Sequence, residues 1–240
     1  MESAIAPNDA LCERLRIVQK RIDSTAKRCG REEEITVVAI SKTHPAGRVR
    51  AAIGCGVADI GENRLQEAEP KIQEVGRNSV RWHLVGHLQA NKARKAVKLF
   101  DVIHSLDSLD LARRLNRLCG EEKREVLPVL LQVKLSAEET KSGVAEEDLF
   151  SLSREVNACD RLKLVGLMSV PPYFEDPEKV RPFFRRLREL RDELKSRGSF
   201  AGSVGELSMG MTQDFEVAIE EGATILRIGT AIFGERPQAG

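Results

Sequence analysis

Short apolar runs and amphipathic helical segments alternate along almost the whole of this 240-residue chain. Several of the apolar runs are rich in β-branched residues and almost unbroken, which is typical of strands buried on both faces of a parallel sheet. Six such strands are expected at residues 35–41, 57–60, 80–86, 102–106, 126–135 and 162–170. Two more stop at small residues, the seventh at Ser208 and Gly210 and the eighth at Gly229 and Thr230. The alternation therefore predicts parallel strands joined by right-handed helical crossovers.

Seven helices separate the eight strands, each with apolar residues at steps of three and four. Eight strand–helix units in a chain of this length predict a single-domain (β/α)8 barrel that spans residues 1–240. Only residues 235–240 follow the eighth strand, so the last unit lacks its helix. A further amphipathic helix at residues 9–29 is expected to cover that gap.

An open, doubly wound sheet is the competing architecture for this alternation. Its dinucleotide-binding version carries GxGxxG at the first strand–helix turn. The first predicted strand is followed instead by Lys42-Thr43-His44-Pro45. The barrel is therefore the favoured fold.

The charge and composition exclude several classes of partner. The formal net charge is +1, which gives no bulk attraction to nucleic acid or to a membrane surface. No apolar run approaches the length of a membrane span, and residues 1–7 lack the features of a signal peptide. The five cysteines have no metal-ligand or CxxC spacing, so free, buried or half-buried thiols in a reducing compartment are expected. These features predict a cytoplasmic protein.

In a barrel of this type, function resides at the carboxyl ends of the strands. Lys42 follows the first strand, where an amine that is costly to desolvate can become a nucleophile for a Schiff base. The alternative is a lysine that reaches solvent or pairs with Glu62 or Asp107. Phosphate often binds after strands seven and eight, where Ser208, Gly229 and Thr230 stand. The alternative there is a pair of ordinary turns.

A Schiff-base lysine on the first strand and a phosphate cup on the seventh and eighth suggest pyridoxal 5'-phosphate (PLP) as the cofactor. Arg227 lies two residues before Gly229, so it faces the same side of its strand and could reach the pyridine nitrogen. No cysteine and histidine cluster with metal-ligand spacing competes with this interpretation.

Six motifs in order make the chain resemble the YggS/PROSC family of PLP homeostasis proteins. They are Ala39-Ile40-Ser41-Lys42-Thr43, Gly61-Glu62-Asn63, the segment 82–92, Gly166-Leu167-Met168, the segment 207–211 and the segment 228–234. The resemblance runs from about Leu11 to Arg236. It implies the barrel of alanine racemase without that enzyme's second domain.

By resemblance, Lys42 forms the Schiff base, Ser208, Gly229 and Thr230 hold the phosphate, and Arg227 faces the pyridine nitrogen. The resemblance also places Asn63, His83, Met209 and Gly210 along the site. Lys141 matches a further family motif, in Thr140-Lys141-Ser142-Gly143. Lys134 stands where the family often has asparagine, which leaves the role of that strand end open.

Two functions remain open: a carrier that acts in PLP homeostasis without catalytic turnover, and a small amino-acid racemase. An arginine beside the ring nitrogen leaves it unprotonated and the ring a weak electron sink, which favours the carrier. Racemisation needs acid–base groups on both substrate faces, and Tyr173 is the only tyrosine. The carrier is expected to be a monomer, with PLP and PLP-dependent apo-enzymes as its partners.

Two other functions are less favoured by the sequence. A phosphosugar isomerase would use the same phosphate cup, with Glu62 as its base. A protein-interaction module would use the charged helix at residues 181–197, although a solvated helix explains the same pattern.

Overall fold

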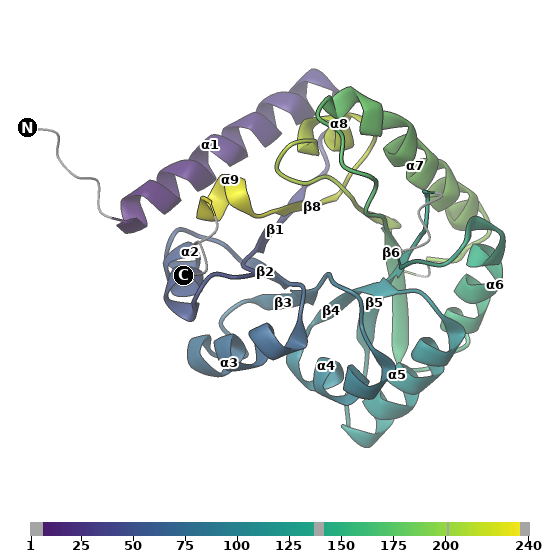
Figure 1. Ribbon diagram of the computed structural model, residues 1–240. Coiled ribbons are helices and arrows are strands. Elements are labelled where there is room, and N and C mark those ends of the chain that lie inside the picture. The colour runs from purple at the N-terminus through teal and green to yellow at the C-terminus, as the bar shows by residue number, and fades with distance from the viewer. Residues whose placement is uncertain (1–6, 137–141, 201, 236–240) are drawn as a thin grey trace, which may run out of the picture.

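The computed structural model describes residues 7–136, 142–200 and 202–235. The described chain alternates strands and helices in the predicted order (Figure 1). The strands are β1 (Thr36–Ile40), β2 (Asp59–Glu62), β3 (Arg81–Leu84), β4 (Val102–Leu106), β5 (Leu127–Gln132), β6 (Leu162–Met168), β7 (Glu206–Ser208) and β8 (Ile225–Ile228).

The eight strands form a closed parallel barrel in sequence order, and β8 pairs with β1. Side chains on each strand alternate between the barrel interior and the surrounding helices. Val38 and Ile40 point inward with apolar residues of other strands, whereas Ala39 belongs to the larger core between barrel and helices. The predicted (β/α)8 barrel is confirmed.

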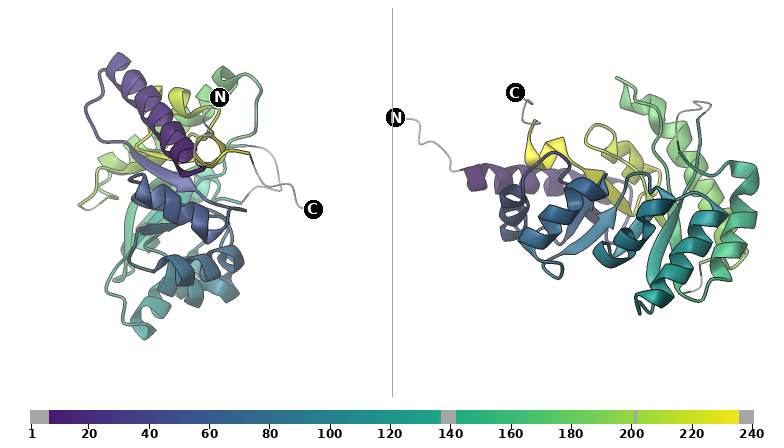
Figure 2. Two further views of the ribbon diagram at one scale, coloured as in Figure 1. Left: turned by 90° about the vertical axis from the view of Figure 1, so that its left-hand side faces the viewer. Right: turned by 60° about the horizontal axis from the view of Figure 1, so that its bottom comes forward.

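The helices surround the barrel, as the two further views show (Figure 2). They are α1 (Pro7–Arg28), α2 (Ala46–Gly54), α3 (Leu65–Val75), α4 (Ala93–Leu99), α5 (Leu109–Glu121), α6 (Glu146–Asn157), α7 (Arg181–Ser196), α8 (Phe215–Glu220) and α9 (Thr230–Phe233), with 3-10 turns η1 (Ala90–Lys92) and η2 (Pro177–Val180). The predicted helix at residues 87–99 begins later, with the 3-10 turn. The turn after β3 needs Gly86, because a Cβ there would lie 2.1 Å from the Asn63 carbonyl oxygen.

Helix α1 closes the ring where the last unit has only the four residues of α9 (Figure 1). It packs against α2, α8 and α9, and its buried Leu11, Val18 and Ile22 follow the helical spacing. Arg14 on α1 donates from Nε to the Ile232 carbonyl at 2.8 Å, and Arg48 on α2 donates to the Phe233 carbonyl at 2.7 Å. The predicted covering role of the N-terminal helix is confirmed.

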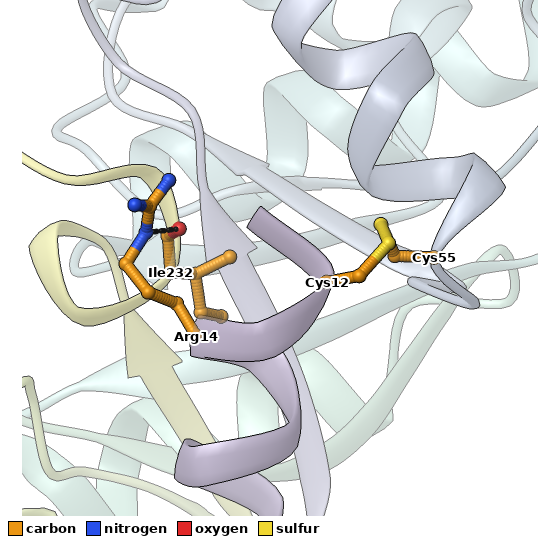
Figure 3. Close-up of a disulfide and its surroundings, with 4 residues drawn as sticks. All are labelled: Cys12, Arg14, Cys55 and Ile232. Atoms are coloured by element: carbon orange, nitrogen blue, oxygen red, sulfur yellow. Dashed lines mark hydrogen bonds between the residues drawn. A yellow bond between two sulfur atoms is a disulfide. The ribbon is translucent and has the colours of Figure 1, made fainter. Parts of the chain in front are cut away.

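The cysteine prediction was wrong for three of the five residues. Cys12 on α1 and Cys55 at the end of α2 form a disulfide, with their Cα atoms 5.2 Å apart (Figure 3). Their separation of 43 residues hides this proximity in the sequence, because packing of α1 against α2 brings them together. Cys29, Cys119 and Cys159 are free thiols, and Cys29 is exposed rather than buried.

None of the described helices is long and apolar enough to cross a membrane.

Candidate functional site

A cavity of about 570 Å³ opens at the carboxyl ends of the strands. Its wall combines residues from β1, β2, β3, β5, β6, β7 and β8 or from the loops that follow them. This is the end of a (β/α)8 barrel where binding sites form. Five of the nine residues expected at the site line the cavity: Lys42, Asn63, Arg227, Gly229 and Thr230. Of the other four, His83 and Ser208 lie buried inside the barrel, and Met209 and Gly210 lie buried against the surrounding helices.

Lys42 reaches the cavity from the segment that follows β1 and is half-buried. Ile40, two residues earlier, lines the same wall, which agrees with inward alternation along this strand. Ser41 between them is fully buried and faces α3. Lys42, the amine predicted from the sequence, therefore lines the cavity just after the first strand.

Arg227 of β8 supplies a buried cation on the neighbouring strand. Its side chain lines the cavity, although the residue is only 4% exposed. Its guanidinium donates to the Ser208 hydroxyl and to the Ser169 carbonyl, both at 2.8 Å. Burial lowers the pKa of Arg227 to about 10, while the Asp214 carboxylate acts in the opposite direction. The group remains charged at neutral pH and can only donate hydrogen bonds.

Ser208 supports Arg227 from below in this geometry. The fully buried hydroxyl of Ser208 accepts from Arg227 and lies 2.9 Å from His104 Nδ1. His104 Nε2 lies 2.8 Å from His83 Nδ1, and His83 Nε2 lies 2.8 Å from an Asp59 carboxylate oxygen. We call these five residues the interior chain, because strand alternation places all of them inside the barrel.

The two charged ends of the interior chain fix the direction of its hydrogen bonds. Arg227 donates to Ser208, so the hydroxyl donates to His104, and each histidine then donates to the next member until Asp59 accepts. Burial lowers the pKa of His83 and holds the pKa of His104 well below its ordinary value. Both rings are therefore neutral at pH 7, and each hydrogen bond of the interior chain joins one donor to one acceptor.

The loop after β7 supplies residues that the sequence interpretation missed. Strand β7 ends at Ser208, and Met209 and Gly210 are buried, so the chain first reaches the cavity at Met211, Thr212, Gln213 and Asp214. Gly210 has φ +90°, and a Cβ there would lie 2.6 Å from the Ala218 Cβ. The signal that could have found them is the length of the segment between the end of β7 and the start of α8, which is long enough to reach the cavity.

Hydroxyl groups meet at the β7–β8 side of the cavity. The Thr230 hydroxyl donates to the Thr212 hydroxyl at 3.2 Å, and the Ala231 amide also approaches it at 3.4 Å. Gly229 precedes Thr230 on the cavity wall. This side therefore offers polar donors from two loops, and β8 lies next to the strand that leads to Lys42.

Glu62 does not line the cavity. It points to the outside of the barrel, where its Oε1 accepts from Lys71 Nζ at 2.7 Å and from the Ser41 hydroxyl. Burial raises the pKa of this fully buried carboxyl, and Lys71 opposes the shift. We call Ser41, Glu62 and Lys71 the wall cluster. A base for an isomerase in the cavity is therefore not supplied by Glu62.

Three other residues from the sequence analysis remain, Asp107, Lys134 and Lys141, and the first two are not among those that line the cavity. Asp107 approaches His87, with 3.4 Å between its carboxylate and His87 Nδ1, and burial raises its pKa. Lys134 is half-buried outside the cavity, and its amide donates to the Val144 carbonyl at 2.9 Å. Lys141 lies outside the described residues. Within those residues, no group of three histidine, cysteine, aspartate or glutamate side chains could hold a metal ion.

Comparison with known proteins identifies the family. Residues 14–237 match the family described as "Alanine racemase, N-terminal domain". A protein of Aquifex aeolicus (strain VF5) called "Pyridoxal phosphate homeostasis protein" is 45% identical over 94% of this chain and 98% of its own. The protein of the same name from Escherichia coli (strain K12) is 41% identical over 91% of this chain and 94% of its own.

Solved structures agree with the sequence matches. PipY of Synechococcus elongatus PCC7942, solved with PLP bound, is 36% identical with a TM-score of 0.82, over 93% of this chain and all of that one. Alanine racemase from Corynebacterium glutamicum shares only the fold, at 16% identity and a TM-score of 0.71, over 97% of this chain and 62% of that one. The chain therefore belongs to the alanine racemase N-terminal domain family, among the relatives that are called pyridoxal phosphate homeostasis proteins.

Proposed function

We propose that this protein binds PLP in the cavity, holds it covalently at Lys42, and acts in intracellular PLP homeostasis as a carrier without significant turnover. One observation carries the proposal: Lys42, in the segment that follows β1, and the buried Arg227 of the adjacent strand β8 line the same cavity. Relatives named for PLP homeostasis and a PLP-bound structural relative support the choice of cofactor.

The cavity fits the chemistry of this cofactor. PLP combines an aldehyde, a pyridine nitrogen and a phosphate, and the cavity presents groups suited to each. Lys42 supplies the amine, Arg227 supplies a donor, and Thr212, Gly229 and Thr230 form a polar corner. Residues 1–240 are proposed to form one PLP-binding domain.

When bound, the cofactor supplies an aldehyde that condenses with a neutral primary amine and releases one water molecule. Lys42 contributes that amine. The hydroxyls of Thr212 and Thr230 orient the phosphate end, and Asn63 lines the wall beside Lys42. We assign Ser208 to support of Arg227, since its hydroxyl is committed to Arg227 and His104.

Arg227 is the reason to propose a carrier rather than an enzyme. With a pKa of about 10 it stays protonated at neutral pH, and it would offer a hydrogen bond to the ring nitrogen of the bound cofactor without giving up its proton. The ring then withdraws electrons weakly, and this disfavours carbanion chemistry.

A small racemase remains the second candidate function. Tyr173 favours it, because this residue lines the cavity and could supply an acid on the face opposite Lys42. Tyr173 is 70% exposed, so nothing in the described chain holds it over the substrate position. This exposure supports the carrier.

We further propose that PLP-dependent apo-enzymes receive the cofactor, that the protein is a monomer, and that it works in the cytoplasm. Disulfides are rare in that compartment, so Cys12–Cys55 is the observation against the location. Cell fractionation with alkylation of free thiols tests the location. Light scattering of the purified protein tests the oligomeric state.

Titration of the purified protein with PLP tests the carrier proposal. We expect a visible absorbance band from the bound cofactor, which Lys42→Ala abolishes. Incubation of the loaded protein with L- and D-amino acids, followed by chiral chromatography, is expected to show no multiple turnover. Repeated interconversion of any amino acid would establish the racemase instead.

A further inference from the structure

The residues on both sides of Lys42 are held by one helix, α3. Ser41 contacts Lys71 of α3, and Thr43 contacts Glu67 of α3. Glu67 and Lys71 are four residues apart, so they lie on the same face of that helix. Lys42 itself projects the other way and lines the cavity.

Ser41 is fixed at every polar atom. Its amide donates to the Gly61 carbonyl at 3.0 Å, and its hydroxyl donates to Glu62. Its carbonyl accepts from Lys71 Nζ at 2.7 Å and from the His44 amide at 3.0 Å. The residue before Lys42 therefore has little freedom to rotate or shift.

The partners of Ser41 are themselves a buried ion pair. Lys71 is 8% exposed, Glu62 is fully buried, and Lys71 Nζ lies 2.7 Å from Glu62 Oε1. The second carboxylate oxygen of Glu62 has no hydrogen-bond partner. Burial of two charges costs much of what their attraction gains, so such a pair is a poor source of stability. A positional role explains its place directly behind Lys42.

Thr43, on the other side of Lys42, has a left-handed backbone with φ +67°. A β-branched residue rarely adopts this region, so surrounding contacts must hold it there. Glu67 provides one such contact, because its carboxylate accepts from the Thr43 amide at 3.2 Å. The turn after Lys42 is thus strained and held by α3.

We propose that Glu62, Lys71 and Glu67 are positioning residues that clamp the backbone on both sides of Lys42 and aim its amine into the cavity. This inference rests on the proposed function, because it explains how the cofactor-binding lysine is presented. None of the three residues touches the cavity.

Three substitutions test the clamp. Lys71→Met removes the contacts to Ser41 and Glu62. Glu67→Ala removes the acceptor for the Thr43 amide, whereas Glu67→Gln keeps an oxygen in its place. Arg77→Gln is the matched control, because it breaks a half-buried ion pair with Asp101 just beyond α3 and away from the cavity.

The first readout is hydrogen exchange of residues 41–44 in PLP-free protein, measured by mass spectrometry. The second is PLP affinity, with borohydride reduction and peptide mapping. Lys71→Met and Glu67→Ala are expected to speed exchange and to weaken PLP binding by about tenfold, the scale of loss when a reacting group is misplaced. Glu67→Gln and Arg77→Gln should stay close to wild type.

The clamp would be overturned if Lys71→Met and Glu67→Ala both kept the hydrogen-exchange rate and the PLP affinity of the wild type. The proposed function would survive that result, provided that Lys42 is still labelled as in the wild type. If Lys71→Met does not fold, the Glu67→Ala and Glu67→Gln pair decides the question. Absence of a reducible label at Lys42 in the wild type would instead overturn the proposed function, and the clamp with it.

Discussion

One buried polar network lies behind Lys42 and another lies beneath Arg227, and the two networks are built differently. The wall cluster behind Lys42 lies outside the barrel and rests on one ion pair, Glu62–Lys71. The interior chain beneath Arg227 lies inside the barrel and joins five side chains through hydrogen bonds of 2.8–2.9 Å. The wall cluster depends on the attraction between two opposite charges. The interior chain depends on three neutral side chains, with matched donors and acceptors, that connect Arg227 to Asp59.

The difference determines how each network fails. Loss of a partner in the wall cluster leaves a carboxylate whose pKa burial already raises, so it can take up a proton and become neutral. Loss of His104, in the middle of the interior chain, removes the partner of one neutral group on each side, the Ser208 hydroxyl and His83 Nδ1. The interior chain should therefore be the more sensitive of the two to a single substitution.

His104→Leu should have the largest effect on stability. It removes the acceptor for the Ser208 O–H and the donor to His83 Nδ1 in a fully buried site, while Ser208 still accepts from Arg227. We expect a loss of about 3 kcal/mol in the free energy of unfolding, from two unsatisfied buried groups. Urea unfolding measures it, and a loss below about 1 kcal/mol would contradict the matched chain.

Lys71→Met should lower the free energy of unfolding by less than His104→Leu does, by about 2 kcal/mol at neutral pH, because Glu62 can become protonated. The loss should shrink as the pH falls, since protonation of Glu62 then costs less. Replacement of both members by methionine should restore stability to within about 1 kcal/mol of wild type. A double variant as unstable as the single one would show that the ion pair itself stabilises the fold.

The pH dependence of stability should separate the networks further. His83 and His104 have pKa values below the ordinary 6.5 in the folded chain, so the unfolded chain takes up protons first as the pH falls. Below pH 6.5 stability should therefore drop, by up to about 1.4 kcal/mol per pH unit for each histidine. Glu62 acts in the opposite direction, because its raised pKa makes the folded chain bind the proton first.

Unfolding of the wild type between about pH 7 and pH 5 checks this sign. His104→Leu should flatten the decline, and Glu62→Gln should make it steeper. An unchanged slope in His104→Leu would mean that this histidine does not titrate differently in the two states.

Thr43→Gly should have the smallest effect. Glycine relieves the left-handed strain at φ +67°, but it also adds freedom to the unfolded chain. These two effects nearly cancel, so the free energy of unfolding should change by no more than about 0.5 kcal/mol. Hydrogen exchange at residues 42–44 should nevertheless rise; protection equal to wild type would show that the contact with Glu67 alone holds the turn.

Much of the fold could be predicted because periodic patterns report it directly. The alternation of apolar runs and amphipathic helices predicted the barrel and placed Lys42 at its carboxyl-end mouth, and strand parity placed Arg227 on the same side as Gly229. Strand alternation shows which side of the sheet a residue faces, but it does not show at which residue of the strand the cavity floor lies. Ser208 and His83 face inward, yet both lie below the floor and serve the interior chain.

The remaining misses depend on contacts that no local pattern records. The Cys12–Cys55 disulfide joins residues 43 positions apart. Lys71 has the residue type of a solvated helix face, but it is buried because Glu62 and Ser41 meet it from two strands. Thr212 reaches the cavity because six residues separate the end of β7 from the start of α8.

Borohydride reduction of the PLP-loaded protein, followed by peptide mapping, tests the central claim most directly. The account predicts one dominant labelled lysine, Lys42, and loss of the label in Lys42→Ala. A label spread over other lysines, or no label at all, would contradict a cofactor held between Lys42 and Arg227.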